Sequence, residues 1–294
     1  MIVVTGATGH LGRHVVTELL KKVPASEIAV AVRSPEKAKA DFDGRGIQIR
    51  LGDYDKPETF GGALEGATKV LLISASEVGK RVVQHQSVID AAKTANVSLL
   101  AYTSILGGDK NKMKLAAEHQ ETEARIQSSG LPFTFLRNGW YIENYTERLA
   151  SPLEHGVMAG CAGNGRIAAA TRADYAAAAA AVLAGDGHAN KAYELTGDTS
   201  FTMPELAAEV SRVSGKTVAY QDISVADYTR MLVGLGLPEL AASVVADADF
   251  GITRGELDDA SHTLSRLIGR PTTPWKDVVA AALAVHHATT PAAS

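Results

Sequence analysis

Residues 1 to 12 read Met1-Ile-Val-Val-Thr-Gly6-Ala-Thr-Gly9-His-Leu-Gly12, a short apolar stretch followed by three evenly spaced glycines, and the amphipathic stretch His14–Leu20 comes next. This order predicts a buried strand, a tight turn and a helix, with the pyrophosphate of a dinucleotide bound at the turn. Gly6 would make the turn, Gly9 would let backbone N–H groups approach the phosphates, and Gly12 would let the helix lie close to the strand. The helix N-terminus would add partial positive charge.

The glycine spacing is G-x-x-G-x-x-G and not the G-x-G-x-x-G of the standard fingerprint, so the same residues can also form an ordinary strand-to-helix loop. Their position between a Val/Ile strand and an amphipathic helix favours the nucleotide interpretation. The residues expected to contact the cofactor here are Gly6, Ala7, Thr8, Gly9, His10, Leu11 and Gly12.

Apolar stretches of strand length alternate with helical stretches through the first half of the chain. We expect strands at Ile2–Val4, Ile28–Val32, Ile47–Leu51, Val70–Ile73, Leu99–Thr103 and Phe133–Leu136. Strands that are apolar throughout are typical of a parallel sheet buried on both faces. The pattern therefore predicts an α/β fold of the Rossmann type, a doubly wound parallel sheet whose ligands bind beyond the carboxyl ends of the strands.

The chain of 294 residues is long enough for one large domain and a smaller one. The regular alternation ends after Tyr145. We expect residues 1–150 to form the dinucleotide-binding domain, completed by residues 166–190, and residues 151–294 to form a smaller C-terminal α/β lobe on the substrate side, with a cleft between the two. Residues 288–294 are expected to be a frayed tail.

Composition limits the partners and the compartment. The net charge is −4 with no basic block, which disfavours nucleic acid. Cys161 is the only cysteine, which excludes an internal disulfide and fits a reducing compartment, and no metal-binding motif is present, so no metal is expected. No apolar stretch approaches the ~18 residues of a membrane span. With a strand predicted from residue 2 there is no room for a signal peptide, and we expect a cytoplasmic protein without a membrane partner.

The second predicted strand is followed by Arg33, at the position where an NAD-binding chain usually carries an acidic residue for the ribose 2′-hydroxyl. A carboxylate repels a 2′-phosphate, whereas a guanidinium can bind it with two charge-assisted hydrogen bonds. Lys37, one helical turn later, can add a second charge. The alternative is a solvated loop arginine. We predict NADPH as the cofactor, in preference to NADH.

Polar and small residues follow the third and fourth predicted strands. Asp53 can accept a hydrogen bond from the adenine amino group, or Asp53 or Asp55 can instead cap the helix that carries Pro57; both interpretations stay open. Ser74, Ala75 and Ser76 are small enough for the cofactor's ribose and pyrophosphate to pass over them.

The end of the fifth strand, Tyr102-Thr-Ser104, is expected beside the nicotinamide. None of the eight tyrosines has a lysine four residues later, so the Tyr-x-x-x-Lys acid/base pair of conventional short-chain dehydrogenases is absent. Any catalysis must then suit an acceptor that needs little proton assistance during hydride transfer.

An aromatic and amide cluster follows the sixth strand. The cluster runs from Asn138, Gly139, Trp140 and Tyr141, which the resemblance described below implies contact the cofactor, into Asn144 and Tyr145. Aromatic faces with a few directional amides suit a flat conjugated ligand. Alternatively, Trp140 and Tyr141 only pack the two lobes together.

The sequence resembles the NmrA-like branch of atypical short-chain dehydrogenases in six motifs, Thr5-Gly-Ala-Thr-Gly-His-Leu-Gly12, Ala31-Val-Arg-Ser-Pro-Glu-Lys37, Gly52-Asp-Tyr54, Ser74-Ala-Ser-Glu-Val-Gly79, Ala101-Tyr-Thr-Ser104 and Leu136-Arg-Asn-Gly-Trp-Tyr-Ile-Glu-Asn-Tyr145. The resemblance continues through the second half of the chain. It implies a reductase that transfers hydride from NADPH to a small-molecule quinone without a flavin, with Asn144, Tyr145 or Tyr102 beside the developing oxyanion.

The same resemblance leaves two alternatives. Similar proteins include reductases of triphenylmethane dyes, which are also flat conjugated acceptors. NmrA itself is a nucleotide-sensing regulator without an enzymatic role, and its cofactor site would look similar. We also allow for a homodimer.

Overall fold

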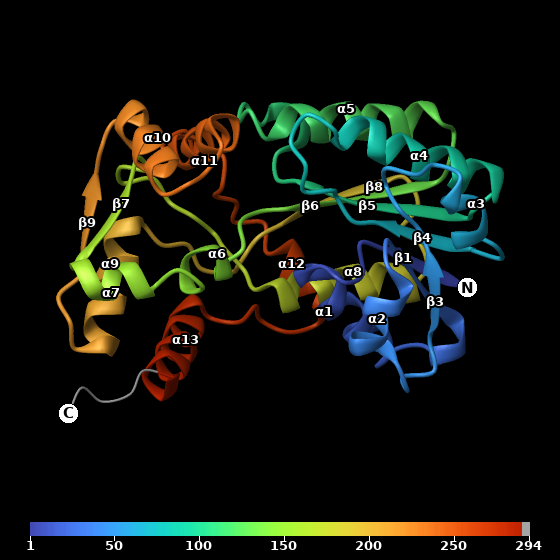
Figure 1. Cartoon of the computed structure of the whole chain (residues 1–294), viewed down its shortest axis with the longest axis horizontal. Helices are drawn as coiled ribbons and strands as arrows, with labels where there is room; N and C mark the ends of the chain where they lie inside the picture. The colour runs from blue at the N-terminus through green and yellow to red at the C-terminus, as the bar shows by residue number, and fades with distance from the viewer. Residues whose placement is uncertain (290–294) are drawn as a thin grey trace.

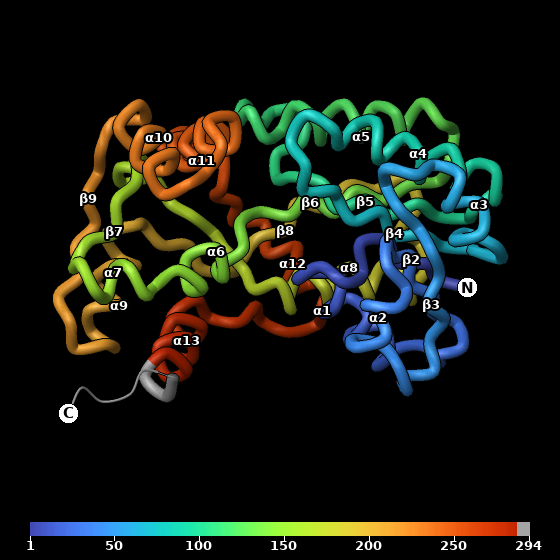
Figure 2. The backbone as a smooth tube through the Cα atoms, in the orientation of Figure 1, coloured from blue at the N-terminus to red at the C-terminus, as the bar shows by residue number. Residues whose placement is uncertain are grey.

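The computed structural model describes residues 1–289, and it has a larger part with a central sheet and a smaller part beside it (Figures 1 and 2). The sheet is parallel throughout, with the strand order β3-β2-β1-β4-β5-β6-β8. Its strands are β1 (Ile2–Thr5), β2 (Ile28–Val32), β3 (Gln48–Leu51), β4 (Lys69–Leu72), β5 (Leu99–Ile105), β6 (Phe133–Asn138) and β8 (Lys191–Leu195). The order reverses at β1, so the predicted doubly wound fold is confirmed.

Helices cover both faces of this sheet (Figure 1). One face carries α1 (His10–Leu19), α2 (Pro35–Phe42), α8 (Arg172–Ala184) and α12 (Thr263–Ile268); the other carries α3 (Thr59–Ala63), α4 (Arg81–Thr94) and α5 (Ala116–Ser128). Side chains of a strand alternate between the two cores. In β1, Ile2 and Val4 pack with the α1 and α8 side, and Val3 packs with the α3 to α5 side.

The smaller part contains a two-stranded parallel sheet of β7 (Val157–Gly160) and β9 (Ala219–Asp222). Its helices are α6 (Glu143–Thr146), α7 (Ala150–His155), α9 (Met203–Ser214), α10 (Val225–Gly234), α11 (Glu239–Ile252) and α13 (Trp275–Thr289). Two short 3-10 turns, Ala25–Glu27 and Gly108–Lys110, lie in the larger part. A separate core that includes Phe201, Leu206 and Trp275 holds the smaller part together.

Three details differ from the sequence-based expectation. Strand β8 belongs to the main sheet, where it pairs with β6. Helix α1 begins at His10, so Gly12 lies inside its first turn and not before it. Strand β3 is only partly buried, because it is the edge strand of the sheet. The division of the chain into two domains near residue 150 stays a prediction. Since β8 pairs with β6, it joins residues 166–190 among the later segments that complete the dinucleotide-binding domain.

The expected frayed tail overlaps the end of α13, which continues to Thr289, and residues 290–294 lie outside the described residues. Within residues 1–289, no helix is both long and apolar enough to span a bilayer.

Candidate functional site

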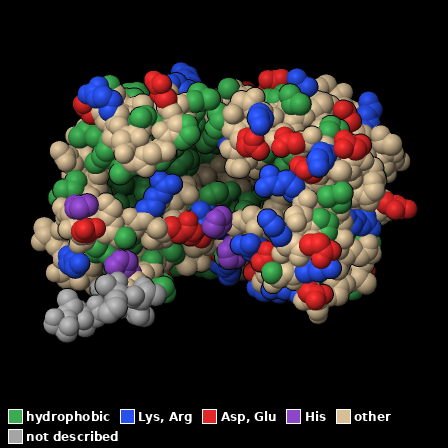
Figure 3. All heavy atoms as spheres, viewed as in Figure 1, with side chains coloured by type: hydrophobic (Ala, Val, Ile, Leu, Met, Phe, Trp, Pro, Cys, Tyr) green, Lys and Arg blue, Asp and Glu red, His purple; other side chains and the backbone are tan. Residues whose placement is uncertain are grey.

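A cavity of about 720 Å³ lies at the carboxyl ends of the main strands, where the two parts of the molecule meet. Figure 3 shows the surface hollowed between these parts, with largely hydrophobic side chains visible in the hollow. Of the residues predicted from sequence, those that line the cavity are Gly6, Thr8, Gly9, His10, Leu11, Gly12, Arg33, Asp53, Ser74, Ala75, Ser76, Asn138, Gly139, Trp140, Tyr141 and Asn144. Ala7, Lys37, Tyr102 and Tyr145 do not line it.

Unpaired buried polar atoms mark this cavity as a ligand site. Among the described residues, five buried side-chain polar atoms lack a hydrogen-bond partner. Four of them belong to cavity-lining residues: Arg81 Nη1, Gln84 Oε1, Ser104 Oγ and Asn138 Oδ1. Buried polar groups are normally satisfied, because an unpaired one costs about 1–3 kcal/mol. Their concentration here indicates that a polar ligand completes the site.

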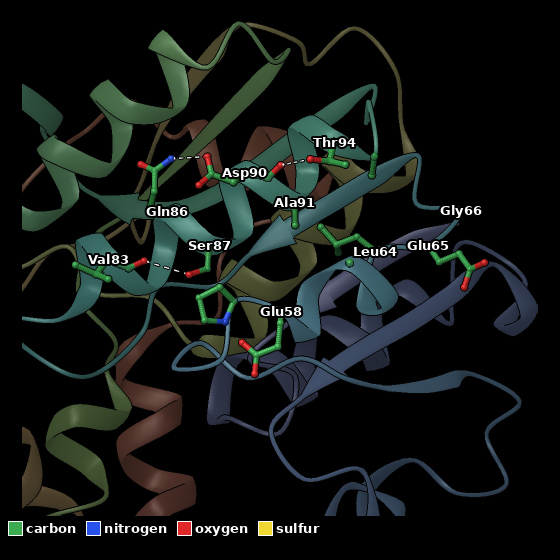
Figure 4. A pocket seen from close by; sticks show the side chains of 13 residues that line it. Glu58, Leu64, Glu65, Gly66, Val83, Gln86, Ser87, Asp90, Ala91 and Thr94 are labelled. Carbon is green, nitrogen blue, oxygen red and sulfur yellow. Dashed lines mark hydrogen bonds between the residues drawn. The ribbon is translucent and has the colours of Figure 1, made fainter.

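A second groove, of about 700 Å³, lies between α3 and α4 (Figure 4). Its polar side chains bond within their own helix: Gln86 Nε2 donates to Asp90 Oδ1 at 2.8 Å, and Thr94 Oγ1 donates to the Asp90 carbonyl at 3.0 Å. Ser87 Oγ likewise donates to the carbonyl oxygen of Val83. The groove also has the exposed glutamates Glu58 and Glu65, but none of the buried polar atoms without a partner in residues 1–289 belongs to it.

The glycine loop has the geometry of a phosphate site. Gly6 has a φ of +60°, which side-chain-bearing residues rarely adopt. A Cβ on Gly12 would lie 2.5 Å from the carbonyl oxygen of Gly6 and 2.6 Å from Ala7 Cα, so α1 packs directly on the turn. Gly9 is exposed to the cavity and α1 has no side-chain cap, which leaves N–H groups of its first turn free for an anion. Ala7 points into the core instead.

Arg33 and Lys37 differ in their placement. Arg33 is exposed, lines the cavity and has no ion-pair partner among residues 1–289. Its guanidinium is therefore free to bind a 2′-phosphate. Lys37 is exposed on α2 away from the cavity wall.

Asp53 is buried in a turn and caps no helix. Its Oδ1 accepts a hydrogen bond from the Asp55 N–H at 3.2 Å, and the N-cap position of α3 is Glu58. The adjacent Tyr54 joins neighbouring strands: its hydroxyl donates to the Ile73 carbonyl at 2.7 Å and lies 2.6 Å from Thr5 Oγ1. The turn after β3 is thus fixed to the ends of β1 and β4.

The wall formed by Ser74 and Ala75 is held from behind. The Ser74 N–H donates to Thr103 Oγ1 at 2.8 Å, and the Ala75 N–H donates to His85 Nε2 at 2.9 Å. Burial lowers the pKa of His85 to about 3, so its imidazole is neutral at neutral pH. Because Nε2 accepts a hydrogen bond, the proton is on Nδ1, which donates to Thr122 Oγ1 at 2.9 Å.

Tyr102 lies on the far side of this wall. It is fully buried with the α3 to α5 core, and its hydroxyl is 2.8 Å from Nδ1 of His119, which does line the cavity. Burial raises the Tyr102 pKa and lowers that of His119 to about 3, so both are neutral at neutral pH. Tyr145 packs edge-on against Phe201 in the smaller part. Neither tyrosine faces the cavity, because neighbouring side chains of a strand or helix point in different directions.

Asn144 and Arg172 form the wall farthest from Arg33. Arg172, at the start of α8, is buried, forms an ion pair with Glu147 and lies 5.5 Å from the centre of the Tyr141 ring. Its Nη2 donates to Asn144 Oδ1 at 3.4 Å. Since the amide oxygen of Asn144 faces this cation, its NH₂ group is left to donate to a ligand. The end of the cavity therefore combines a fixed amide donor, a buried positive charge and aromatic faces.

Ser104, expected beside the nicotinamide at the end of the fifth strand, lines the cavity near the end of β5, which reaches Ile105. Several other polar lining residues escaped the sequence analysis. Arg172 left a signal, since it is a charged residue within the Ala-rich stretch from Ile167 to Ala184. Arg81 and Gln84 left none, because polar residues on an amphipathic helix ordinarily face water.

No group of three or more His, Cys, Asp or Glu side chains within the described part of the chain could hold a metal ion. Fold, glycine loop and cavity together define a dinucleotide-binding protein of the Rossmann class. The chain belongs to the NmrA-like family, whose model matches residues 1–262, so the resemblance inferred from the six motifs is confirmed.

Individual relatives agree with this assignment. The chain is 51% identical to quinone oxidoreductase 2 of Escherichia coli (strain K12) over 279 residues, which are 95% of this chain and 97% of that protein. It is similar to the crystal structure of the E. coli NADPH-dependent quinone oxidoreductase complexed with NADPH, with a TM-score of 0.93 over 96% of this chain and 99% of that one. It is also similar to Citrobacter sp. triphenylmethane reductase complexed with NADP(H), at 40% identity and a TM-score of 0.90 over 96% of this chain and 100% of that one.

Proposed function

We propose that this protein is an NADPH-dependent oxidoreductase that transfers hydride to a quinone without a flavin. The observation that carries the proposal is the 51% identity with quinone oxidoreductase 2 across nearly the full length of both chains. In the net reaction the quinone takes up one hydride from NADPH and one proton, and hydroquinone and NADP⁺ are released.

The residues present fit NADPH. Gly9 and the first turn of α1 would bind the pyrophosphate, and Arg33 would bind the 2′-phosphate. Ser104 Oγ and Asn138 Oδ1, both buried and unpaired, offer a donor and an acceptor, the pair that the nicotinamide carboxamide requires. Bound NADPH supplies the hydride, and the protein holds the acceptor close to it.

The acceptor would lie against Asn144 and Arg172. As a quinone takes up hydride, negative charge develops on its oxygen, and a fixed donor facing that oxygen stabilises the transition state. The Asn144 NH₂ group is suited to this role because Arg172 holds its carbonyl oxygen. Burial raises the pKa of both Tyr102 and Tyr145, which weakens them as proton donors at neutral pH.

The activity is tested by adding a simple benzoquinone to purified, flavin-free protein with NADPH and following NADPH absorbance. We expect absorbance to fall with the parent protein and to fall more slowly with Asn144→Ala, at unchanged NADPH affinity. Tyr145→Phe and Tyr102→Phe serve as comparisons and should react close to the parent rate, because neither side chain lines the cavity.

Two other outcomes identify the alternatives. Faster oxidation of NADPH by a triphenylmethane dye than by any quinone would favour a dye reductase, which the 40% identity with the Citrobacter reductase makes the second candidate. Tight NADPH binding without oxidation by either acceptor would favour a regulator of the NmrA type.

We further propose that the protein acts in the cytoplasm, without nucleic acid, and that it can form a homodimer. Light scattering of the purified protein across a range of concentrations tests the homodimer directly.

A further inference from the structure

Two polar side chains of α4 face the cavity with atoms that nothing in the protein satisfies. Gln84 is 4% exposed and Arg81 is 8% exposed, yet Gln84 Oε1 and Arg81 Nη1 have no hydrogen-bond partner. Both residues line the cavity, and they lie three positions apart on one face of the helix. The two residues therefore leave one acceptor and one donor for a ligand to satisfy.

The Gln84 amide has a defined orientation. Its Nε2 donates to Asp55 Oδ1 at 2.9 Å and lies 3.4 Å from Glu77 Oε1. Both of these neighbours are carboxylate oxygens, which only accept hydrogen bonds, so the nitrogen must face them. The carbonyl oxygen of Gln84 is consequently left as a buried acceptor without a partner, so a ligand group that completes it must donate.

Arg81 is fixed in a similar way. Its Nε donates to the Ala75 carbonyl oxygen at 2.6 Å, which anchors the guanidinium behind the wall after β4. Nη1 remains as a donor without an acceptor.

The order of the strands decides which part of the cofactor reaches these atoms. The phosphate loop follows β1, Arg33 follows β2, and the Asp53–Asp55 turn follows β3, the edge strand on that side. A dinucleotide whose 2′-phosphate binds Arg33 has its adenosine half on this side and its nicotinamide toward β5 and β6. Because Gln84 bonds to Asp55, it lies at the adenosine end.

We propose that Gln84 is the residue that recognises the adenine base of NADPH, with Oε1 accepting a hydrogen bond from the exocyclic amine. This inference rests on the proposed NADPH site. Adenine carries an exocyclic amine donor, which matches the unpaired acceptor of Gln84. A base with an oxygen in place of the amine would bring two acceptors together at Gln84.

Asp53 is less suited to this role. Its Oδ1 already accepts the hydrogen bond of the Asp55 N–H, and its side chain forms part of the turn. Gln84 Oε1 is buried without any partner, whereas Asp53 already has one, so we assign the adenine amine to Gln84 on α4.

The test compares binding of NADPH with that of its hypoxanthine analogue, which has an oxygen in place of the amine and an N–H at the neighbouring ring nitrogen. Both are titrated into the parent protein without acceptor, using nicotinamide fluorescence. We expect the parent to bind NADPH roughly 5- to 150-fold more tightly, the range for leaving one buried partner unpaired. Equal affinities would overturn the inference while leaving NADPH binding intact. Failure to bind either compound would overturn the proposed function as well.

Two variants on the same helix sharpen the test. Gln84→Leu removes the acceptor at similar volume, so it should weaken NADPH binding and bring the two affinities within about threefold. Gln86→Leu is the matched control: Gln86 lies in the groove of Figure 4, bonded to Asp90, and its loss should leave the discrimination unchanged. If Gln84→Leu retains the parent's discrimination, Gln84 does not read the base.

Discussion

Two glycines of the phosphate loop should respond in opposite ways to an added side chain. At Gly12 a Cβ would lie 2.5 Å from the Gly6 carbonyl oxygen and 2.6 Å from Ala7 Cα, both backbone atoms that cannot rotate away. An ordinary contact begins near 3.4 Å, so the turn or α1 must move by roughly 0.9 Å. Overpacking of this kind costs ~1–3 kcal/mol, which lowers Tm by roughly 2–10 °C in a chain of this size.

Gly9 lacks this constraint. Its φ of −72° and ψ of 168° are extended values that valine adopts readily, and its Cβ would meet only the Gly6 carbonyl oxygen, at 3.2 Å. Gly9→Val should therefore keep the parent Tm to within about 2 °C. Its side chain would occupy the space through which the pyrophosphate approaches the N–H groups. Losing two charged hydrogen bonds of ~1.5–3 kcal/mol each raises the NADPH Kd by at least ~100-fold.

The assay pairs thermal unfolding by circular dichroism, measured without cofactor because bound NADPH would itself raise Tm, with a fluorescence titration of NADPH. We expect Gly9→Val to be folded and unable to bind, and Gly12→Ala to be destabilised and weakened in binding. A folded Gly9→Val variant with parent affinity would refute the phosphate-loop assignment. A Gly12→Ala variant with parent Tm would refute the close packing of α1 on the turn.

Three further predictions follow from the site. Arg33→Ala should weaken NADPH binding by roughly 10-fold, the lower end for an exposed charged partner, and leave NADH unchanged, whereas Lys37→Ala should alter neither; equal losses for both cofactors would contradict a role in reading the phosphate. Arg172→Met should lower the quinone turnover number while NADPH affinity stays within about threefold, and a loss confined to NADPH affinity would place Arg172 on the cofactor instead. Burial lowers the pKa of His85 and His119 to about 3, against about 6.5 when unfolded, so below pH 6.5 the unfolded chain binds more protons. As the pH is lowered below 6.5, the free energy of unfolding should therefore decrease by up to ~1.4 kcal/mol per pH unit for each histidine. Urea unfolding at pH 7 and pH 5 should show a smaller decrease in this free energy for His119→Gln than for the parent.

The sequence alone determined the sheet and the phosphate loop, because both depend on local patterns. Strands that are apolar throughout are typical of a sheet buried on both faces. Gly6 has a positive φ that side-chain-bearing residues rarely adopt, and Gly12 stands where a side chain would clash with backbone. Arg33 was readable for the same reason, since the residue after β2 always reaches the same place beside the ribose.

Tertiary structure alone decided which polar side chains face the cavity. Tyr102 and Ser104 lie two residues apart in β5, yet only Ser104 lines the cavity, and Tyr145 packs into the smaller part while its neighbour Asn144 faces the acceptor end. Gln84 became a candidate only once Asp55 and Glu77 were seen to hold its nitrogen. Periodicity gives the face of a helix or strand, but whether a polar atom there is satisfied depends on residues far away in sequence. That is settled only when the chain has folded.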